Sequence, residues 1–163
     1  MAEPVDARLL AEMLDRHGAA LALFAAQWTT AADDCVQEAL VELARQPEAP
    51  TNPAAWLYRT VRNRALNASR AARRRTAHEQ AAPAPRGAAQ RSAGGAEQVE
   101  LADLLAALDD AQRETVVLRV WGQLTWDEIA AIVGGSKSAA QRRYVHSLEH
   151  LRRLWESPSC PKT

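Results

Sequence analysis

The sequence predicts an all-α protein: two small helical domains joined by a flexible linker, the C-terminal one a helix-turn-helix. Three observations favour this fold class. Apolar residues recur at three- and four-residue steps on both sides of the middle of the chain. Alanine supplies much of the 47% apolar fraction, which suits helices packed closely through small residues. One central stretch lacks the large apolar residues that a core requires.

The N-terminal domain, residues 1–75, is expected to contain three helices. The first carries an apolar stripe of Leu9, Leu10, Met13, Leu14, His17 and Leu21. The second follows Thr30 and sets Val36, Leu40 and Leu43 against an acidic face. Residues 46–53 contain three prolines and predict a loop. The third extends from Ala54 to about Arg75, with a stripe of small apolar residues at Leu57, Val61, Ala65, Ala68 and Ala72.

The opposite face of this third helix indicates nucleic-acid binding. Residues 59–75 contain seven arginines and no acid, whereas solvated helices usually mix the two charges. Trp56 shares this face and favours single strands, because unpaired bases stack on aromatic rings while arginines neutralise phosphates. A solvated face, with Trp56 in the core, is the alternative. The face comprises Trp56, Arg59, Arg62, Asn63, Asn67, Arg70, Arg73 and Arg74.

Residues 76–98 are expected to form the flexible linker. They include two prolines and three glycines, and no Leu, Ile, Val or aromatic residue. Such a segment cannot bury enough apolar surface to offset the entropy of ordering it.

The C-terminal domain, residues 99–163, is expected to be a helical bundle. Leu101, Leu104, Leu105 and Leu108 predict its first helix. Asp109 with Gln112, and Thr125 with Glu128, have the spacing of capping boxes, and Leu124 with Ile129 that of a hydrophobic staple. Gly122 and Gly134 mark helix ends, and Ser136 can cap a last helix that continues to about Trp155. That helix is expected to bury Ala140, Tyr144, Leu148 and Leu151.

A short helix, a glycine-containing turn and a longer basic helix predict a helix-turn-helix. Gln141 and Arg142 are of the residue types that recognise adenine and guanine edges in the major groove. Arg143, Arg152 and Arg153 are better suited to phosphate contacts. An antiparallel helix pair with a solvated basic face is the alternative. The outward residues near the start of the long helix are Lys137, Ser138, Gln141, Arg142, Val145 and His146.

The formal net charge of zero conceals an alternation along the chain. Residues 1–55 carry −6, 56–100 carry +6, 101–133 carry −4 and 134–163 carry +4. Charge asymmetry between segments indicates interaction surfaces, so the neutral total does not exclude nucleic acid.

Other features exclude further classes. The longest apolar run, residues 19–26, is far shorter than the roughly 20 residues of a membrane span, and no signal peptide is evident. With only Cys35 and Cys160, a reducing, cytoplasmic setting is expected. His146 and His150 have i, i+4 spacing without a third ligand, so no metal site is expected. No phosphate loop or nucleophile elbow is present, and neither cofactor nor enzymatic activity is expected.

Three segments together resemble the extracytoplasmic-function, or group 4, sigma factors of bacterial RNA polymerase. DDCVQEALVELARQP resembles conserved region 2.2, NPAAWLYRTVRNRALNASRAARRR resembles regions 2.3–2.4, and LDDAQRETVVLRVWGQLTWDEIAAIVGGSKSAAQRRYVHSLEHLRRL resembles region 4. The chain departs from the family's usual pattern at Asn67, Gly135, Ala139 and Ala140. These departures bear on which promoter sequence the protein recognises more than on its function.

The resemblance implies a role for each segment. The protein would bind core RNA polymerase, through the β′ clamp helices and the β flap, and direct promoter recognition and strand opening. Docking would use Asp34, Gln37, Glu38 and Glu42. The melted −10 strand would be held by Asn52, Trp56, Arg59, Arg62, Asn63, Asn67 and Arg70. The duplex −35 element would be bound by Lys137, Ser138, Gln141, Arg142, Arg143 and His146.

An anti-sigma factor is a possible further partner, and no membrane is expected to be involved. Two other functions remain open: a stand-alone helix-turn-helix regulator, and a degenerate paralogue that sequesters a partner without initiating transcription.

Overall fold

The computed structural model describes residues 4–78 and 96–156 of the 163-residue chain, and side chains of 4–78 and 101–156. Within these ranges it has seven helices and no strand, which confirms the predicted all-α class. The chain divides into two compact units, Met1–Gln90 and Arg91–Thr163, and each is described by itself.

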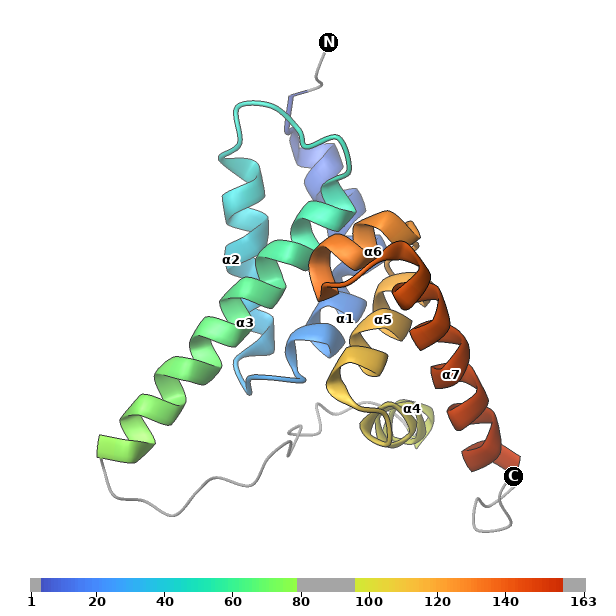
Figure 1. Ribbon diagram of the computed structural model, residues 1–163. Helices are drawn as coiled ribbons and strands as arrows, with labels where there is room; N and C mark the ends of the chain where they lie inside the picture. Colours follow the sequence, from blue (N-terminus) through green and yellow to red (C-terminus); the bar gives the residue numbers. More distant parts are fainter. Residues whose placement is uncertain (1–3, 79–95, 157–163) are drawn as a thin grey trace. The chain divides into compact units, whose positions relative to one another are not determined.

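The first unit is a three-helix bundle of α1 (Ala7–Ala25), α2 (Ala32–Ala44) and α3 (Pro53–His78), in which each helix packs against the other two (Figure 1). Asp6 caps α1, its Oδ1 accepting a hydrogen bond from the Leu9 amide at 2.8 Å. Pro53 occupies the first position of α3, where a missing N–H costs nothing. The fully buried core comprises Leu21, Phe24, Leu43, Leu57, Tyr58 and Val61.

The second half of α3 extends beyond this core. No residue of the helix after Ala65 is buried; Ala68 is half-buried and Ala72 is exposed, although the sequence predicts both in the apolar stripe. At about 1.5 Å per residue, the 26 residues of α3 span about 39 Å and the 13 residues of α2 only about 20 Å. Among the described helices of the first unit, α2 is therefore too short to cover the last turns of α3.

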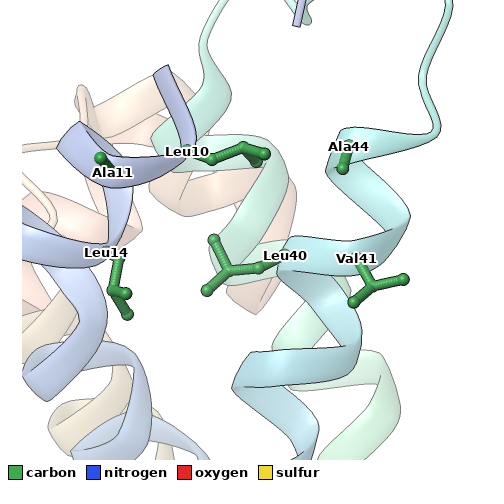
Figure 2. Close-up of a pocket in the computed structure, with 6 residues that line it drawn as sticks. All are labelled: Leu10, Ala11, Leu14, Leu40, Val41 and Ala44. Atoms are coloured by element: carbon green, nitrogen blue, oxygen red, sulfur yellow. The ribbon is translucent and has the colours of Figure 1, made fainter. Parts of the chain in front are cut away.

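A shallow apolar groove of about 250 Å³ lies between α1 and α2. Leu14 was predicted to be buried, but 52% of it is exposed at this groove, as is 50% of Val41. Figure 2 shows Leu10, Ala11 and Leu14 on α1, and Leu40 on α2 extending toward Leu14. The stripe on α1 is wider than α2 and α3 can cover, so its edge remains in solvent.

The second unit comprises α4 (Ala96–Ala106), α5 (Asp110–Val120), α6 (Trp126–Val133) and α7 (Lys137–Glu156). Helices α5, α6 and α7 pack against one another, and α4 packs against α7 (Figure 1). Both predicted capping boxes are present, Asp109 with Gln112 and Thr125 with Glu128. The core consists mainly of Leu105, Leu108, Val116, Val117, Leu118, Leu124, Ile129 and Ala140.

Glycines form the turn between α6 and α7. Gly134 and Gly135 have φ angles of 98° and 93°, which L side chains rarely adopt. Ser136 then caps α7, its Oγ accepting a hydrogen bond from the Ala139 amide at 3.1 Å. Glycine therefore suits both positions of this turn, including Gly135, where the chain departs from the family pattern.

The buried face of α7 differs by one residue from the predicted face. Ala140 and Ser147 are fully buried, Tyr144 and Leu151 are half-buried, and 41% of Leu148 is exposed. The Ser147 hydroxyl donates to the Arg143 carbonyl at 2.7 Å, so its polar atom is satisfied inside the helix. A small residue at 147 lets α7 approach its neighbours, and the step from 144 to 147 directs Leu148 outward.

Part of the linker expected over residues 76–98 is helical. Helix α3 continues to His78 and α4 already begins at Ala96, while residues 79–95 lie outside the described part of the chain. Among the residues that are described, no helix is both long and apolar enough to cross a bilayer.

Candidate nucleic-acid interface

The outer face of α3 brings most of the predicted strand-binding residues together. Arg59, Asn63, Asn67 and Arg70 are exposed and recur at three- and four-residue steps, so they form one row. Trp56 stands at the start of this row and is half-buried, which leaves part of its indole accessible. The face therefore presents guanidinium, amide and aromatic groups to solvent.

Asn52 has a structural task at this helix. Its Oδ1 accepts a hydrogen bond from the Ala55 amide at 3.0 Å, and its carbonyl accepts from the Trp56 amide at 3.1 Å. Asn52 is thus the N-cap of α3, which fixes where the helix begins and where Trp56 lies.

Arg62 lies on one flank of the outer face. It is half-buried, and its guanidinium carbon is 5.8 Å from the centre of the Trp28 ring, in the turn between α1 and α2. Trp28 contacts Phe24 edge-on, with ring centres 5.2 Å apart, and Phe24 contacts Tyr58 at 5.5 Å. An aromatic cluster that begins in the core therefore ends at an arginine of the candidate interface.

Arg64, on the other flank, clamps two of the predicted docking residues. Its Nη1 donates to Glu38 Oε2 at 2.6 Å and its Nη2 to Glu42 Oε2 at 2.5 Å. The hydrogen bond to Glu42 is the main cause that raises the pKa of Arg64 above its ordinary value. One guanidinium thus ties the acidic face of α2 to α3.

The other two predicted docking residues, Asp34 and Gln37, are exposed on α2. Cys35, between them in sequence, is buried, and its burial raises the pKa of the thiol, with the Glu38 carboxylate adding to the effect. The thiol is therefore protonated at neutral pH, as is typical of a cysteine buried in a protein core.

Helix α7 presents its predicted base-reading residues to solvent. Ser138, Gln141 and Arg142 are exposed over the first two turns, and so is Val145. Lys137 is also exposed, with its Nζ 3.5 Å from Asp127 Oδ2 on α6. His146 is exposed with its Nδ1 3.7 Å from Glu149 Oε2. These are surface pairs, which a phosphate could displace at little cost.

Arg143 differs from the rest of the predicted set. It is half-buried and its Nη1 is enclosed, so its side chain lies along the flank of α7 instead of on the exposed face. Position 143 is three residues after Ala140 and four before Ser147, close to the buried stripe of the helix.

A stacked assembly behind α7 supports its position. The Arg119 guanidinium carbon is 4.4 Å from the centre of the Trp126 ring, and its Nη1 donates to the Leu124 carbonyl at 2.8 Å. Trp126 in turn contacts the Tyr144 ring of α7 at 5.3 Å. Arg119 thus connects α5 to the turn before α6 and to Trp126, and Trp126 connects α6 to the basic helix.

Among the described residues, no group of three or more His, Cys, Asp or Glu side chains could hold a metal ion. The exposed guanidinium, amide and hydroxyl groups of the two basic helices, with the half-buried indole of Trp56, offer hydrogen bonding, charge neutralisation and stacking. Those are the interactions by which proteins hold nucleic acid.

Comparison with known proteins identifies the family. Residues 13–75 match Sigma-70 region 2, and residues 98–151 match Sigma-70, region 4. Together these matches cover most of the chain, which belongs to the sigma-70 family. Proteins of this family are non-catalytic transcription initiation factors. No curated protein matches the chain in sequence.

Two solved structures are similar to the chain over nearly its whole length. CnrH, solved in complex with the cytosolic domain of CnrY, has 26% identity and a TM-score of 0.62, covering 94% of this chain and 92% of its own. Sigma factor RpoE from Bartonella quintana, solved with the anti-sigma factor NepR, has 23% identity and a TM-score of 0.68, covering 93% and 98%. The second similarity shows a shared fold.

Trp28, Arg64 and Arg119 are not among the site residues that the sequence predicts. A signal existed for Arg64, which follows Leu57 by about two helical turns and so borders the buried stripe. Its partners Glu38 and Glu42 have the i, i+4 spacing that places two acids on one side of a helix. Nothing local in the sequence marks Trp28 as a neighbour of Arg62.

Proposed function

We propose that the protein binds core RNA polymerase, brings it to a promoter and holds the melted strand open. Two basic helices in separate units carry the proposal. The outer row of α3, with Trp56 and its arginines and asparagines, suits a single strand of the −10 element. The exposed start of α7, with Gln141 and Arg142, suits the major groove of a duplex −35 element.

We assign polymerase docking to α2. Asp34 and Gln37 are exposed, and Glu38 keeps 62% of its side chain accessible despite its pair with Arg64. The neighbouring groove with Leu14 and Val41 adds apolar surface next to these acids. A basic surface such as the β′ clamp helices would complement the acids, apolar side chains of the same surface would cover the groove, and the β flap would take the second unit.

The two regions, about 1–75 and 99–163, would act as modules on one tether, residues 76–98. Linking two weak binding sites in this way raises overall affinity without a new contact. Free protein should therefore bind promoter DNA weakly, and polymerase should be needed to present both modules. Such a role places the protein in the cytoplasm, where polymerase and promoter meet.

An inhibitory protein partner forms part of the proposal. The neighbours CnrH and RpoE were each solved in complex with a partner, the cytosolic domain of CnrY and the anti-sigma factor NepR respectively. We expect an anti-sigma factor for this chain that competes with polymerase. Co-purification of the tagged full chain from its own cells, with and without added core polymerase, tests that expectation.

Run-off transcription with purified core polymerase tests the initiation role. The full chain should direct a promoter-specific transcript from a genomic template library, and core polymerase alone should not. A stand-alone regulator or a sequestering paralogue would yield no such transcript, and that result would end the proposal. Tight sequence-specific binding by the free chain in a gel shift would favour the regulator.

An assay of strand opening distinguishes the proposed role of α3 from that of α7. Trp56→Ala should reduce opening, measured by permanganate reactivity of unpaired thymines, while leaving binding to the duplex −35 end intact. Equal loss in both assays would identify Trp56 as a core residue and remove it from the proposed strand-binding set.

A further inference from the structure

Trp28 is held in a fixed place at the edge of the first unit. Its amide donates to the Ala25 carbonyl at 3.0 Å, and the Thr29 amide donates to the same carbonyl at 3.3 Å. The Ala31 amide donates to Thr29 Oγ1 at 3.1 Å, which closes the turn into α2. The backbone around Trp28 is therefore set by local hydrogen bonds, independently of any ligand.

The indole of Trp28 faces two environments. Toward the interior it contacts the fully buried Phe24, with ring planes at 88° to one another. Toward the surface it meets the guanidinium of Arg62 at 5.8 Å. The ring remains only half-buried, so a planar group could still reach it from solvent.

Arg62 connects this ring to the outer face of α3. It follows Arg59 by three residues, and Arg59 belongs to the exposed row that starts at Trp56. Trp28 thus borders the candidate interface although it is 34 positions before Arg62 in sequence. Aromatic rings and guanidinium groups are the groups on which unpaired bases stack, and here the guanidinium carbon of Arg62 lies over the Trp28 ring.

We propose that Trp28 and Arg62 form a second stacking site, which takes one unpaired base of the melted DNA strand on the flank of α3. The inference rests on the proposed function, in which the outer row of α3 holds that strand. It adds a contact from the α1–α2 turn and a base beyond the one near Trp56.

A structural role for Trp28, as a cover over Phe24 and Tyr58, predicts different behaviour. Trp28→Leu retains an apolar side chain over Phe24 and removes the ring, whereas Trp28→Phe retains a ring. Stacking therefore predicts that Phe is better than Leu in DNA binding. A cover over the core predicts that binding follows thermal stability in both variants.

The test uses holoenzyme made from core polymerase and the full chain, on a premelted form of the promoter found by run-off transcription. Each unpaired position of the non-template strand is replaced in turn by an abasic nucleotide. Trp28→Leu should weaken binding about 5- to 150-fold, the equivalent of one base–aromatic stack of roughly 1–3 kcal/mol. On the DNA that lacks the stacked base, Trp28→Leu and the unsubstituted protein should bind equally tightly.

Controls keep the result specific. Trp155→Leu removes a different indole, at the end of α7, where Trp155 is 57% exposed. This variant should leave DNA binding unchanged. Arg62→Leu should show its loss at the same abasic position as Trp28→Leu, and it serves as the test if Trp28→Leu lowers the melting temperature strongly.

The outcomes distinguish failure of the second stacking site from failure of the proposed function. A loss that is equal at all positions, or no loss in Trp28→Leu and Arg62→Leu, overturns the second stacking site. If Trp56→Ala still impairs opening in that case, the proposed function stands. If the unsubstituted protein directs no transcript at all, the proposed function fails and this inference fails with it.

Discussion

The two basic helices of this protein, α3 and α7, differ in how their polar side chains are used. On α3, Arg62 contacts Trp28, Arg64 clamps Glu38 and Glu42, and Asn52 caps the helix. On α7, Ser138, Gln141 and Arg142 are exposed on a helix that is supported from behind by Arg119, Trp126 and Tyr144.

This difference determines whether DNA binding can be altered without altering stability in each unit. Substitutions at the flanks of α3 alter the packing of the bundle as well as the candidate interface. Substitutions at the exposed start of α7 leave the core untouched. Effects on DNA binding should therefore be independent of stability in α7 and mixed with it in α3.

The largest expected contrast in stability is between the substitutions of two leucines by alanine. Leu57→Ala removes a fully buried side chain of α3 and should lower the free energy of unfolding by about 2–5 kcal/mol. Leu148→Ala, at a residue of α7 that is 41% exposed, should cost less than about 0.5 kcal/mol. Equilibrium denaturation of the full chain, followed by circular dichroism, measures both. Equal costs would contradict the described burial of α7.

Next comes Arg142→Ala, which should weaken holoenzyme binding to the −35 duplex by about 1–3 kcal/mol at a single base pair and leave the melting temperature unchanged. Arg153→Ala is the matched control, because a phosphate contact there would weaken all duplexes alike. A competition assay over singly substituted duplexes distinguishes them. Unchanged base preference in Arg142→Ala would remove this residue from the reading set.

Arg64→Ala should lower the free energy of unfolding by about 1–2 kcal/mol, since its two carboxylate pairs are partly screened by solvent. It should also weaken core-polymerase binding, because Glu38 and Glu42 lose their common anchor. Arg70→Ala on the same helix should do neither. Stability is measured by denaturation and binding by fluorescence anisotropy of the labelled full chain. A stabilised Arg64→Ala protein would show that the clamp is dispensable.

The smallest effect is expected at a cap. Thr125→Ala removes the Oγ that accepts from the Glu128 amide at 3.3 Å and should cost about 1 kcal/mol of stability. Differential scanning calorimetry of the full chain can resolve this loss. Thr125→Ser keeps the hydroxyl and should restore most of the stability; a loss as large as that in Thr125→Ala would point to packing of the methyl group.

Features that depend on neighbouring residues were predictable. Both capping boxes, the glycine turn and the exposed reading face of α7 follow from spacings of a few residues, and each is present. Features that depend on distant residues were not. Burial of Ser147 in place of Leu148 is decided by how closely α7 approaches its neighbours, which helical periodicity alone does not specify.

The candidate site shows the same division. The Trp56 to Arg70 row follows from helix geometry, so periodicity locates it. The clamp joins Arg64 to residues 22 and 26 positions earlier, and such pairs arise only once α2 and α3 have packed. The sequence therefore predicts which side chains the interface contains, but not which of them also hold the bundle together.

The overhang of α3 has a consequence for dynamics. A segment of about a dozen residues is marginal as an isolated helix, and Arg70, Arg73 and Arg74 repel one another at i, i+3 and i, i+4 spacing. Amide protons beyond Ala65 should therefore exchange faster than those before it. A phosphate backbone bound along these turns would neutralise the repulsion and slow that exchange. Bound DNA would thus stabilise the last turns of the helix that binds it.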